Sequence, residues 1–93
     1  MEFGTSFSVI PKTSTTTPGG TVKIAQIVAN ADVAFYTYSV VGGNANGVVT
    51  PVFNDASRAT YAAPQIPGTF TIHAGFTQVN GEKHSSTITI TVQ

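Results

Sequence analysis

Apolar and polar residues alternate with a period of two along most of this chain, and no segment follows the spacing of a helix. In the stretch from Phe70 to Phe76, for example, the apolar residues alternate with Thr71 and His73. Turn residues separate such segments at intervals of about 8–12 residues, as in β-sandwiches. The predicted strands are residues 6–11, 21–29, 33–41, 48–49, 59–62, 70–76 and 87–92. The pattern predicts a single all-β antiparallel sandwich of about seven strands.

The connections between the predicted strands are rich in proline, glycine, asparagine and threonine. Pro64 and Gly68 flank a corner between two β-type runs, which is typical of neighbouring strands in an antiparallel sandwich. The threonine tract before Pro18 is expected to belong to a turn. Residues 48–49 and 59–62 are expected to form two short edge strands, separated by a turn over residues 54–57.

The third predicted strand decides which aromatic side chains enter the core. Tyr36 and Tyr38 alternate with Phe35, and the tyrosine side has the larger continuous apolar area. We therefore expect the tyrosines to point inward and Phe35 to point outward. In the second strand Gln26 breaks the alternation, either as an inward side chain with a partner or because a bulge resets the register. The predicted core contains Tyr36, Tyr38, Tyr61, Phe70, Ile72, Phe76, Ile88 and Ile90.

The last two strands are joined through Asn80-Gly81, a strong hairpin signal. A plain two-residue turn would pair Ile72 with Thr89, and paired residues share one face of the sheet. That register would place a core residue opposite a surface threonine, so the hairpin must contain one extra residue. A bulged loop with Gly81 at positive φ, or a bulge at Gly75, would supply it.

Composition excludes several classes of function. The 93 residues suffice for one domain with one core, and 41% are hydrophobic. Only 9% are charged, against roughly 25% in ordinary globular domains, and the formal net charge is zero. Four scattered Lys and Arg residues do not provide the phosphate contacts that nucleic-acid binding needs. No apolar run approaches the roughly 20 residues of a membrane helix, so we expect no membrane insertion. We expect the isolated domain to be monomeric.

Residues 1–5 have the composition of a cloning scar, because Glu-Phe and Gly-Thr are dipeptides that two common cloning sites encode. We therefore expect residues 6–93 to be the domain itself, taken from a larger protein. The absence of cysteine excludes a disulfide framework and a thiol nucleophile.

Several segments together resemble bacterial immunoglobulin-like (Big-type) modules. They are residues 18–21 (PGGT), 36–43 (YTYSVVGG), 60–64 (TYAAP), 67–74 (PGTFTIHA) and 87–92 (TITITV). The family usually has tryptophan where Tyr38 stands and often tyrosine where Phe70 stands. Because Phe70 lacks a hydroxyl, it cannot form the tyrosine-corner hydrogen bond of such sandwiches. The resemblance implies an immunoglobulin-like β-sandwich used in tandem in secreted or surface proteins of bacteria, or in phage virions.

The ionisable residues form no recognisable catalytic or metal-binding motif. His73 falls in a strand and no Gly-x-Ser-x-Gly motif is present, so we expect no nucleophilic catalysis. His84 is interpreted as a solvated turn residue. Asp32 and Asp55 are isolated in sequence and are interpreted as turn formers, although each has an asparagine nearby that could help line a calcium site. We expect no enzymatic activity, no cofactor and no metal.

One set of residues predicts a binding face. If the tyrosines point inward, an aromatic group and several hydroxyls share the outer face of one sheet, where they could stack on a sugar ring and hydrogen-bond its edges. The candidate residues are Phe35, Thr37, Thr71, His73 and Thr89. The alternative is an ordinary solvated face whose threonines serve strand formation, or a contact with the next module.

Two functions therefore stand side by side. The first is a non-catalytic spacer, stalk or adhesion module of a secreted or cell-surface bacterial protein, in contact with neighbouring domains and with a surface protein. The second is a carbohydrate-binding accessory domain of a polysaccharide-degrading enzyme or a phage virion protein.

Overall fold

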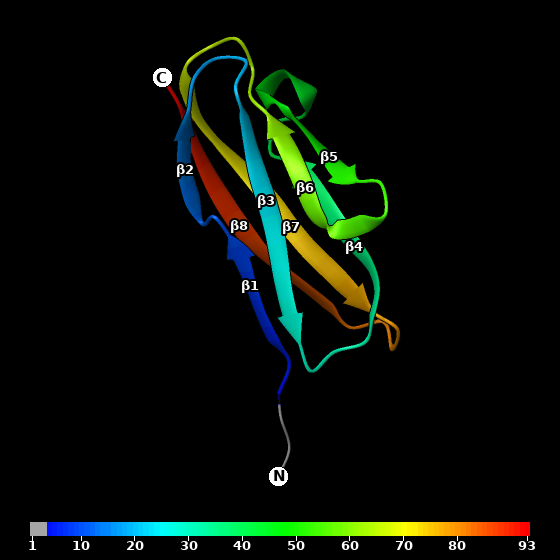
Figure 1. Ribbon diagram of the computed structural model, residues 1–93. Helices are drawn as coiled ribbons and strands as arrows, with labels where there is room; N and C mark the ends of the chain where they lie inside the picture. Colours follow the sequence, from blue (N-terminus) through cyan, green and yellow to red (C-terminus); the bar gives the residue numbers. More distant parts are fainter. Residues whose placement is uncertain (1–3) are drawn as a thin grey trace.

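The computed structural model describes residues 4–93, which form two packed four-stranded sheets (Figure 1). The strands are β1 (Ser6–Ile10), β2 (Thr13–Thr16), β3 (Thr21–Ala29), β4 (Val33–Val40), β5 (Val48–Val52), β6 (Asp55–Ala62), β7 (Gly68–Gln78) and β8 (Lys83–Val92), with a 3₁₀ turn, η1 (Asn44–Asn46). One sheet has the order β1-β3-β6-β5 and the other β2-β8-β7-β4. Every pairing is antiparallel except that of β2 with β8. The predicted all-β sandwich is confirmed, with eight strands instead of about seven.

The additional strand comes from the threonine tract, which is not a turn as expected. β1 pairs with β3 in one sheet, and β2 pairs with β8 in the other. Pro11 ends β1 because it has no N–H to donate. The chain then crosses to the second sheet, where Thr89 N donates to Lys12 O at 2.9 Å and Gln93 N to Thr16 O at 3.0 Å.

The prediction for the two short edge strands is half wrong. β5 is an edge strand and contains Pro51, which an edge tolerates. β6 instead lies between β3 and β5 and spans eight residues, starting at Asp55. Most of the turn expected over residues 54–57 therefore belongs to a strand. Neighbours on both sides satisfy the backbone of β6, so this strand can be buried.

The core lies between the sheets and is made by alternate residues of β3, β6, β7 and β8. Of the predicted core, Tyr61, Ile72, Phe76, Ile88 and Ile90 are at most 1% exposed and Phe70 is 9% exposed. Tyr36 and Tyr38 point inward as expected but are only half-buried. The Tyr38 hydroxyl donates to Ala56 O at 2.7 Å, which links the two sheets at the start of β6.

Gln26 is buried without a bulge. It is 4% exposed and pairs with Val9 in an unbroken register. Its Nε2 donates to Thr37 O across the sandwich at 3.5 Å, a long hydrogen bond, while its Oε1 finds no partner among the described residues. The first of the two alternatives for Gln26 is therefore correct.

The hairpin between β7 and β8 contains the extra residue that the alternation requires. Gln78 N donates to Glu82 O at 2.7 Å and Gly81 N donates to Gln78 O at 2.9 Å. Gly81 has φ of 91°, which glycine adopts without strain. The resulting register pairs Ile72 with Ile88. Gly75 pairs regularly with Ser85, so the alternative bulge at Gly75 does not occur.

The end of the sandwich near the N-terminus is held by polar contacts. Asn30 Nδ2 donates to Gly4 O at 3.2 Å, and the Thr5 hydroxyl donates to Asn30 O at 3.3 Å. Gln78 Nε2 donates to the same hydroxyl at 3.2 Å. Of the five residues predicted as a cloning scar, residues 1–3 lie outside the described residues, and Gly4 and Thr5 make these contacts.

A buried tyrosine fixes the loop before β5. The Tyr61 hydroxyl donates to Asn46 O at 2.7 Å. Gly47 lies directly on the Tyr61 ring at φ of 114°, and a Cβ there would clash with the ring. Tyr61 thus provides a link from a core side chain to a loop backbone, which Phe70 cannot provide.

We expect Tyr61→Phe to lower the free energy of unfolding by about 1–2 kcal/mol, because Asn46 O loses its hydroxyl donor. Tyr36→Phe is the matched control, since no described residue hydrogen-bonds the Tyr36 hydroxyl, and it should change stability by less than about 0.5 kcal/mol. Urea unfolding of both variants measures the difference. Equal losses would show that the hydroxyl of Tyr61 contributes nothing specific.

We also expect the domain to lose stability at alkaline pH. Burial raises the pKa of Tyr38, the polar Gln26 side chain opposes this effect, and Tyr36 and Asp55 add to it; burial also raises the pKa of Tyr61. The folded state therefore holds these protons to higher pH than the unfolded chain, whose tyrosines titrate near pH 10. The stability due to the neutral phenols is complete below about pH 10 and is lost as the pH rises through the folded pKa values.

Urea unfolding between pH 8 and pH 11.5 tests this expectation. The Tyr38→Phe/Tyr61→Phe double variant should be less stable at pH 8 but should depend less on pH above 10. An equally steep decline in the double variant would assign the effect to other groups.

Candidate functional site

The five predicted binding residues all belong to the outer face of the β2-β8-β7-β4 sheet. Phe35 is 54% exposed and Thr37 and His73 are also exposed, while Thr71 and Thr89 are half-buried. Thr71 pairs with Thr89 across β7 and β8, and His73 pairs with Ser39 of β4. The predicted facing of the third strand is therefore confirmed.

The same five residues do not form one compact site. Phe35 pairs with Thr77, which lies six residues along β7 from Thr71. At about 3.3 Å per residue, Phe35 and the Thr71–Thr89 pair are about 20 Å apart. A single sugar ring cannot touch both ends of this face.

A shallow groove of about 330 Å³ lies at the Phe35 end of the face. Its walls are Phe35, Thr37, Thr77, Lys83 and Ser85. Gly75 has no side chain between Thr37 and Ser85, the residues with which it pairs. A Cβ at Gly75 would clash with His84 O, so the close approach of β7 and β8 requires glycine there. The groove joins two of the predicted residues, Phe35 and Thr37, to three that the sequence analysis missed.

Part of the position of the missed residues could have been predicted from the sequence. Once β7 and β8 are paired through Gly81, counting along the strands places Thr77 and Lys83 opposite one another. The pairing of Phe35 with Thr77 could not be counted in the same way. It depends on how β4 pairs with β7, and the register of these two strands shifts by one residue between Val33 and Phe35. The composition of the groove was therefore only partly accessible from the sequence.

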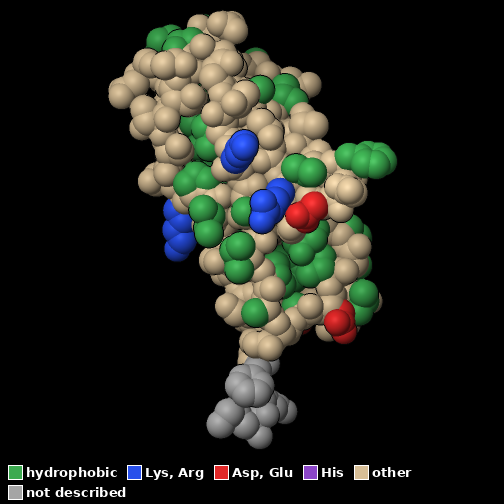
Figure 2. All heavy atoms as spheres, in the orientation of Figure 1, with side chains coloured by type: hydrophobic (Ala, Val, Ile, Leu, Met, Phe, Trp, Pro, Cys, Tyr) green, Lys and Arg blue, Asp and Glu red, His purple; other side chains and the backbone are tan. Residues whose placement is uncertain are grey.

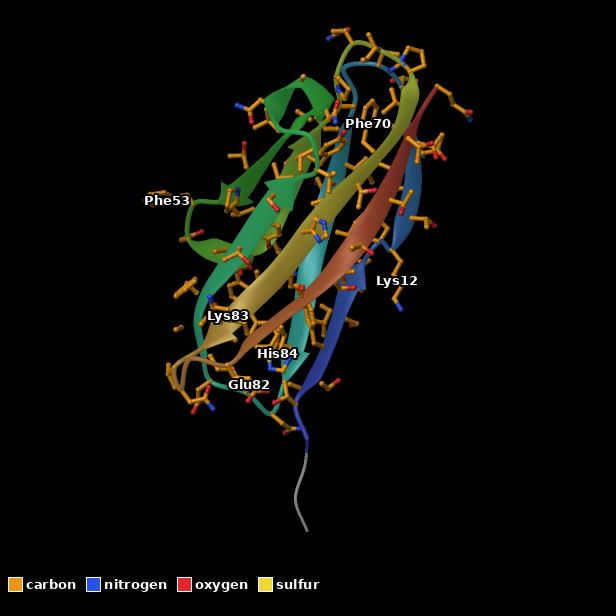
Figure 3. The ribbon with its side chains drawn as sticks, turned by 180° about the vertical axis from the view of Figure 1, so that it is seen from behind. Lys12, Phe53, Phe70, Glu82, Lys83 and His84 are labelled. Carbon is orange, nitrogen blue, oxygen red and sulfur yellow. The ribbon has the colours of Figure 1, made fainter. Side chains whose placement is uncertain are left out.

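His84 does not lie in a solvated turn, contrary to the expectation. It is the second residue of β8, and its ring stacks on Phe76 with centroids 4.8 Å apart and an interplanar angle of 18°. Glu82 lies close to His84 (Figure 3), with Oε1 3.1 Å from Nε2, but Nε2 forms no hydrogen bond with a described residue. Phe76 and His84 form part of the groove lining. The imidazole acts here as a packed aromatic ring.

The acidic residues are spread over the molecule. Asp32 lies beside an open cavity of about 660 Å³ at the N-terminal end of the sandwich, together with Asn30, Asn80 and Glu82. Asp55 pairs with Arg58 at 3.5 Å on the opposite sheet. Across residues 4–93, no three His, Cys, Asp or Glu side chains are grouped as a metal site requires. No helix within those residues is long and apolar enough to cross a membrane.

Comparison with known proteins identifies the fold. No protein-family model and no curated protein matches the sequence. Among solved structures, the chain is similar to CopC from Methylosinus trichosporium OB3b, with 15% identity, TM-score 0.55 and coverage of 92% of this chain and 89% of that one. It is also similar to PcoC, a methionine-rich copper resistance protein from Escherichia coli, with 15% identity, TM-score 0.57 and coverage of 92% and 94%.

A third similar structure is the BIgI domain of the beta protein from S. agalactiae, bound to CEACAM1. The identity is 17%, the TM-score is 0.54, and the match covers 97% of each chain. At these identities the likeness concerns the fold. The chain is an immunoglobulin-like β-sandwich, and the resemblance found in the sequence is confirmed at that level.

Proposed function

We propose that this domain is a non-catalytic structural and adhesion module, a spacer or stalk unit, of a larger secreted or cell-surface bacterial protein. Its partners are then the neighbouring domains of the same polypeptide and a protein on another surface. The whole-length likeness to a bacterial immunoglobulin-like domain supports this reading. The setting could equally be a phage virion, where the mechanical role would be the same.

The observation that carries the proposal is the position of the two ends of the chain. The sandwich is elongated, with extents of 48 × 23 × 21 Å, and the described segment that leads into β1 and the C-terminal end of β8 lie at opposite ends of its long axis (Figure 1). Both ends are tied to the body, Gly4 through Asn30 and Gln93 through Thr16. Domains attached to the two ends would thus be held apart by the length of a rigid body.

The second strand and the last strand are arranged to resist tension. β2, which follows β1 in the chain, runs parallel to the C-terminal strand β8, with Thr13 paired to Thr89 and Thr16 to Val92. A force that pulls the two ends apart draws these strands past one another along their length. The hydrogen bonds between them are then loaded together rather than one after another, which suits a stalk.

The small number of ionisable residues, and their separation in the structure, support a non-catalytic role. His73 is exposed in the middle of a strand, and His84 is stacked in the sheet beside a single carboxylate, that of Glu82. A catalytic site needs several such groups converging on a pocket.

A second candidate function, carbohydrate binding, rests on the groove at Gly75. Phe35 offers an exposed ring, while Thr37, Thr77 and Ser85 offer hydroxyls and Lys83 an ammonium group around it. An apolar platform bordered by hydrogen-bonding groups suits one face and the edge of a sugar ring. This would make the domain an accessory module of a polysaccharide-degrading enzyme or of a virion protein.

We expect the domain to hold two flanking reporter domains at a well-defined distance. A flexible Gly/Ser linker of the same number of residues is the control, and its root-mean-square span is roughly 50–60 Å, close to the long axis of the domain. The width of the distance distribution, measured by spin-label or fluorescence methods, therefore discriminates better than its mean. A distribution as broad as that of the linker would refute the spacer role.

For the second candidate, we expect NMR shifts on titration with soluble plant, bacterial and host polysaccharides. The shifts should cluster at Phe35, Thr37 and Thr77, saturate, and disappear in Phe35→Ala. That variant should retain the fold because Phe35 is 54% exposed, whereas Phe76→Ala, in the core, should cost about 3–5 kcal/mol. A well-folded spectrum without shifts across the panel would exclude the carbohydrate-binding function for these polymers.

A further inference from the structure

The outer face of the β1-β3-β6-β5 sheet carries a second groove, centred on Ala25. The strand registers place Ile10, Ala25 and Arg58 in one row across β1, β3 and β6. The small Ala25 side chain leaves a depression of about 440 Å³, with Ile10, Val52 and the basic residues Lys23 and Arg58 along its sides. Figure 2 shows basic side chains over the middle of this face with apolar groups around them.

An unusually exposed aromatic residue adjoins this groove. Phe53 is fully exposed, at 102% of its reference area, and follows Val52, which is itself 40% exposed and lines the groove. The two-residue loop between β5 and β6 holds Phe53 at its tip, from which the ring points away from the body (Figure 3). No core contact accounts for a phenyl group in this position. Aromatic residues and arginine are enriched at protein–protein interfaces.

The charges on this face favour an acidic partner. Lys23 forms no ion pair with any of residues 4–93, and Arg58 has only the exposed carboxylate of Asp55, at 3.5 Å. The groove therefore presents two cations against one carboxylate, although the whole chain has only four Lys and Arg residues and is neutral. Carboxylates of a partner protein that bind at the edge of this groove would therefore be attracted by its excess positive charge.

A second copy of the chain fits this face poorly. Two such faces packed together would oppose Lys23 and Arg58 of one copy to the same residues of the other. Strand addition at the β5 edge is hindered by Pro51, which has no N–H to donate. Charge complementarity instead favours a different protein with an acidic surface.

We propose that this face, the Ala25 groove together with Phe53, binds a protein partner through a segment in which carboxylates flank an apolar side chain. The apolar side chain occupies the groove against Ile10 and Val52, the carboxylates pair with Lys23 and Arg58, and Phe53 packs on the partner beside them. This proposal rests on the adhesion role proposed above and specifies the chemistry of the protein that is bound.

A displayed library of random 12-residue peptides, selected against the immobilised domain at low ionic strength, tests the proposal. Enriched peptides should combine Asp or Glu with Leu or an aromatic residue. Binding of the best synthetic peptide should weaken at least tenfold in Phe53→Ala and in Lys23→Glu, and also when salt is raised. The matched controls on the other sheet, Phe35→Ala and Lys83→Glu, should bind like the unaltered chain.

Three results would overturn the proposal: no enrichment, enrichment of peptides without carboxylates, or binding unaffected by Phe53→Ala and Lys23→Glu. Concentration-dependent dimerisation abolished by Phe53→Ala would also overturn it and would assign the face to a second copy. All four substitutions are on exposed side chains, and thermal unfolding verifies that each variant is folded. Failure of the spacer role is detected separately, by the distance distribution.

Discussion

The pairing of β7 with β8 places Ile72 opposite Ile88 and Phe70 opposite Ile90, and most of the sandwich depends on this register. These two strands occupy the centre of their sheet, so β2 and β4 are oriented by them. Their inward side chains meet those of β3 and β6, including Ile24 and Tyr61. A shift by one residue would move threonines into the core and isoleucines to the surface. The loop with Gly81 at positive φ prevents that shift.

The same register also shapes the surface. Because β7 and β8 approach so closely at Gly75, only glycine fits there, and the two residues paired with it, Thr37 and Ser85, line the groove beside Phe35. On the other sheet, Ala25 lies between Ile10 and Arg58 and lines the second groove. The first groove is bordered by hydroxyls and the second by apolar and basic groups. A neutral chain with few charges thereby presents two chemically different faces.

An elongated module whose ends are occupied by its neighbours in a polypeptide can meet other molecules only through its sides. In this domain the two grooves lie on the outer faces of the two sheets, and the exposed Phe53 lies at the tip of the loop between β5 and β6. The spacer role and a recognition role are therefore compatible in one small fold. Immunoglobulin-like sandwiches carry many functions, so the assignment has to come from these faces and not from the fold.

The sequence by itself determined the fold class, the inward facing of Tyr36 and Tyr38, the need for one extra residue in the last hairpin, either at Gly81 or at Gly75, and the outward placement of Phe35. These features follow from local alternation and from glycine's conformational freedom, which need no knowledge of distant contacts. Only the tertiary structure decided that the threonine tract joins the second sheet, that β6 is an inner strand and that His84 stacks on Phe76. Each of these depends on which strand becomes a neighbour. It also decided that the predicted binding residues extend over about 20 Å, because cross-strand registers, and not residue types, bring side chains together.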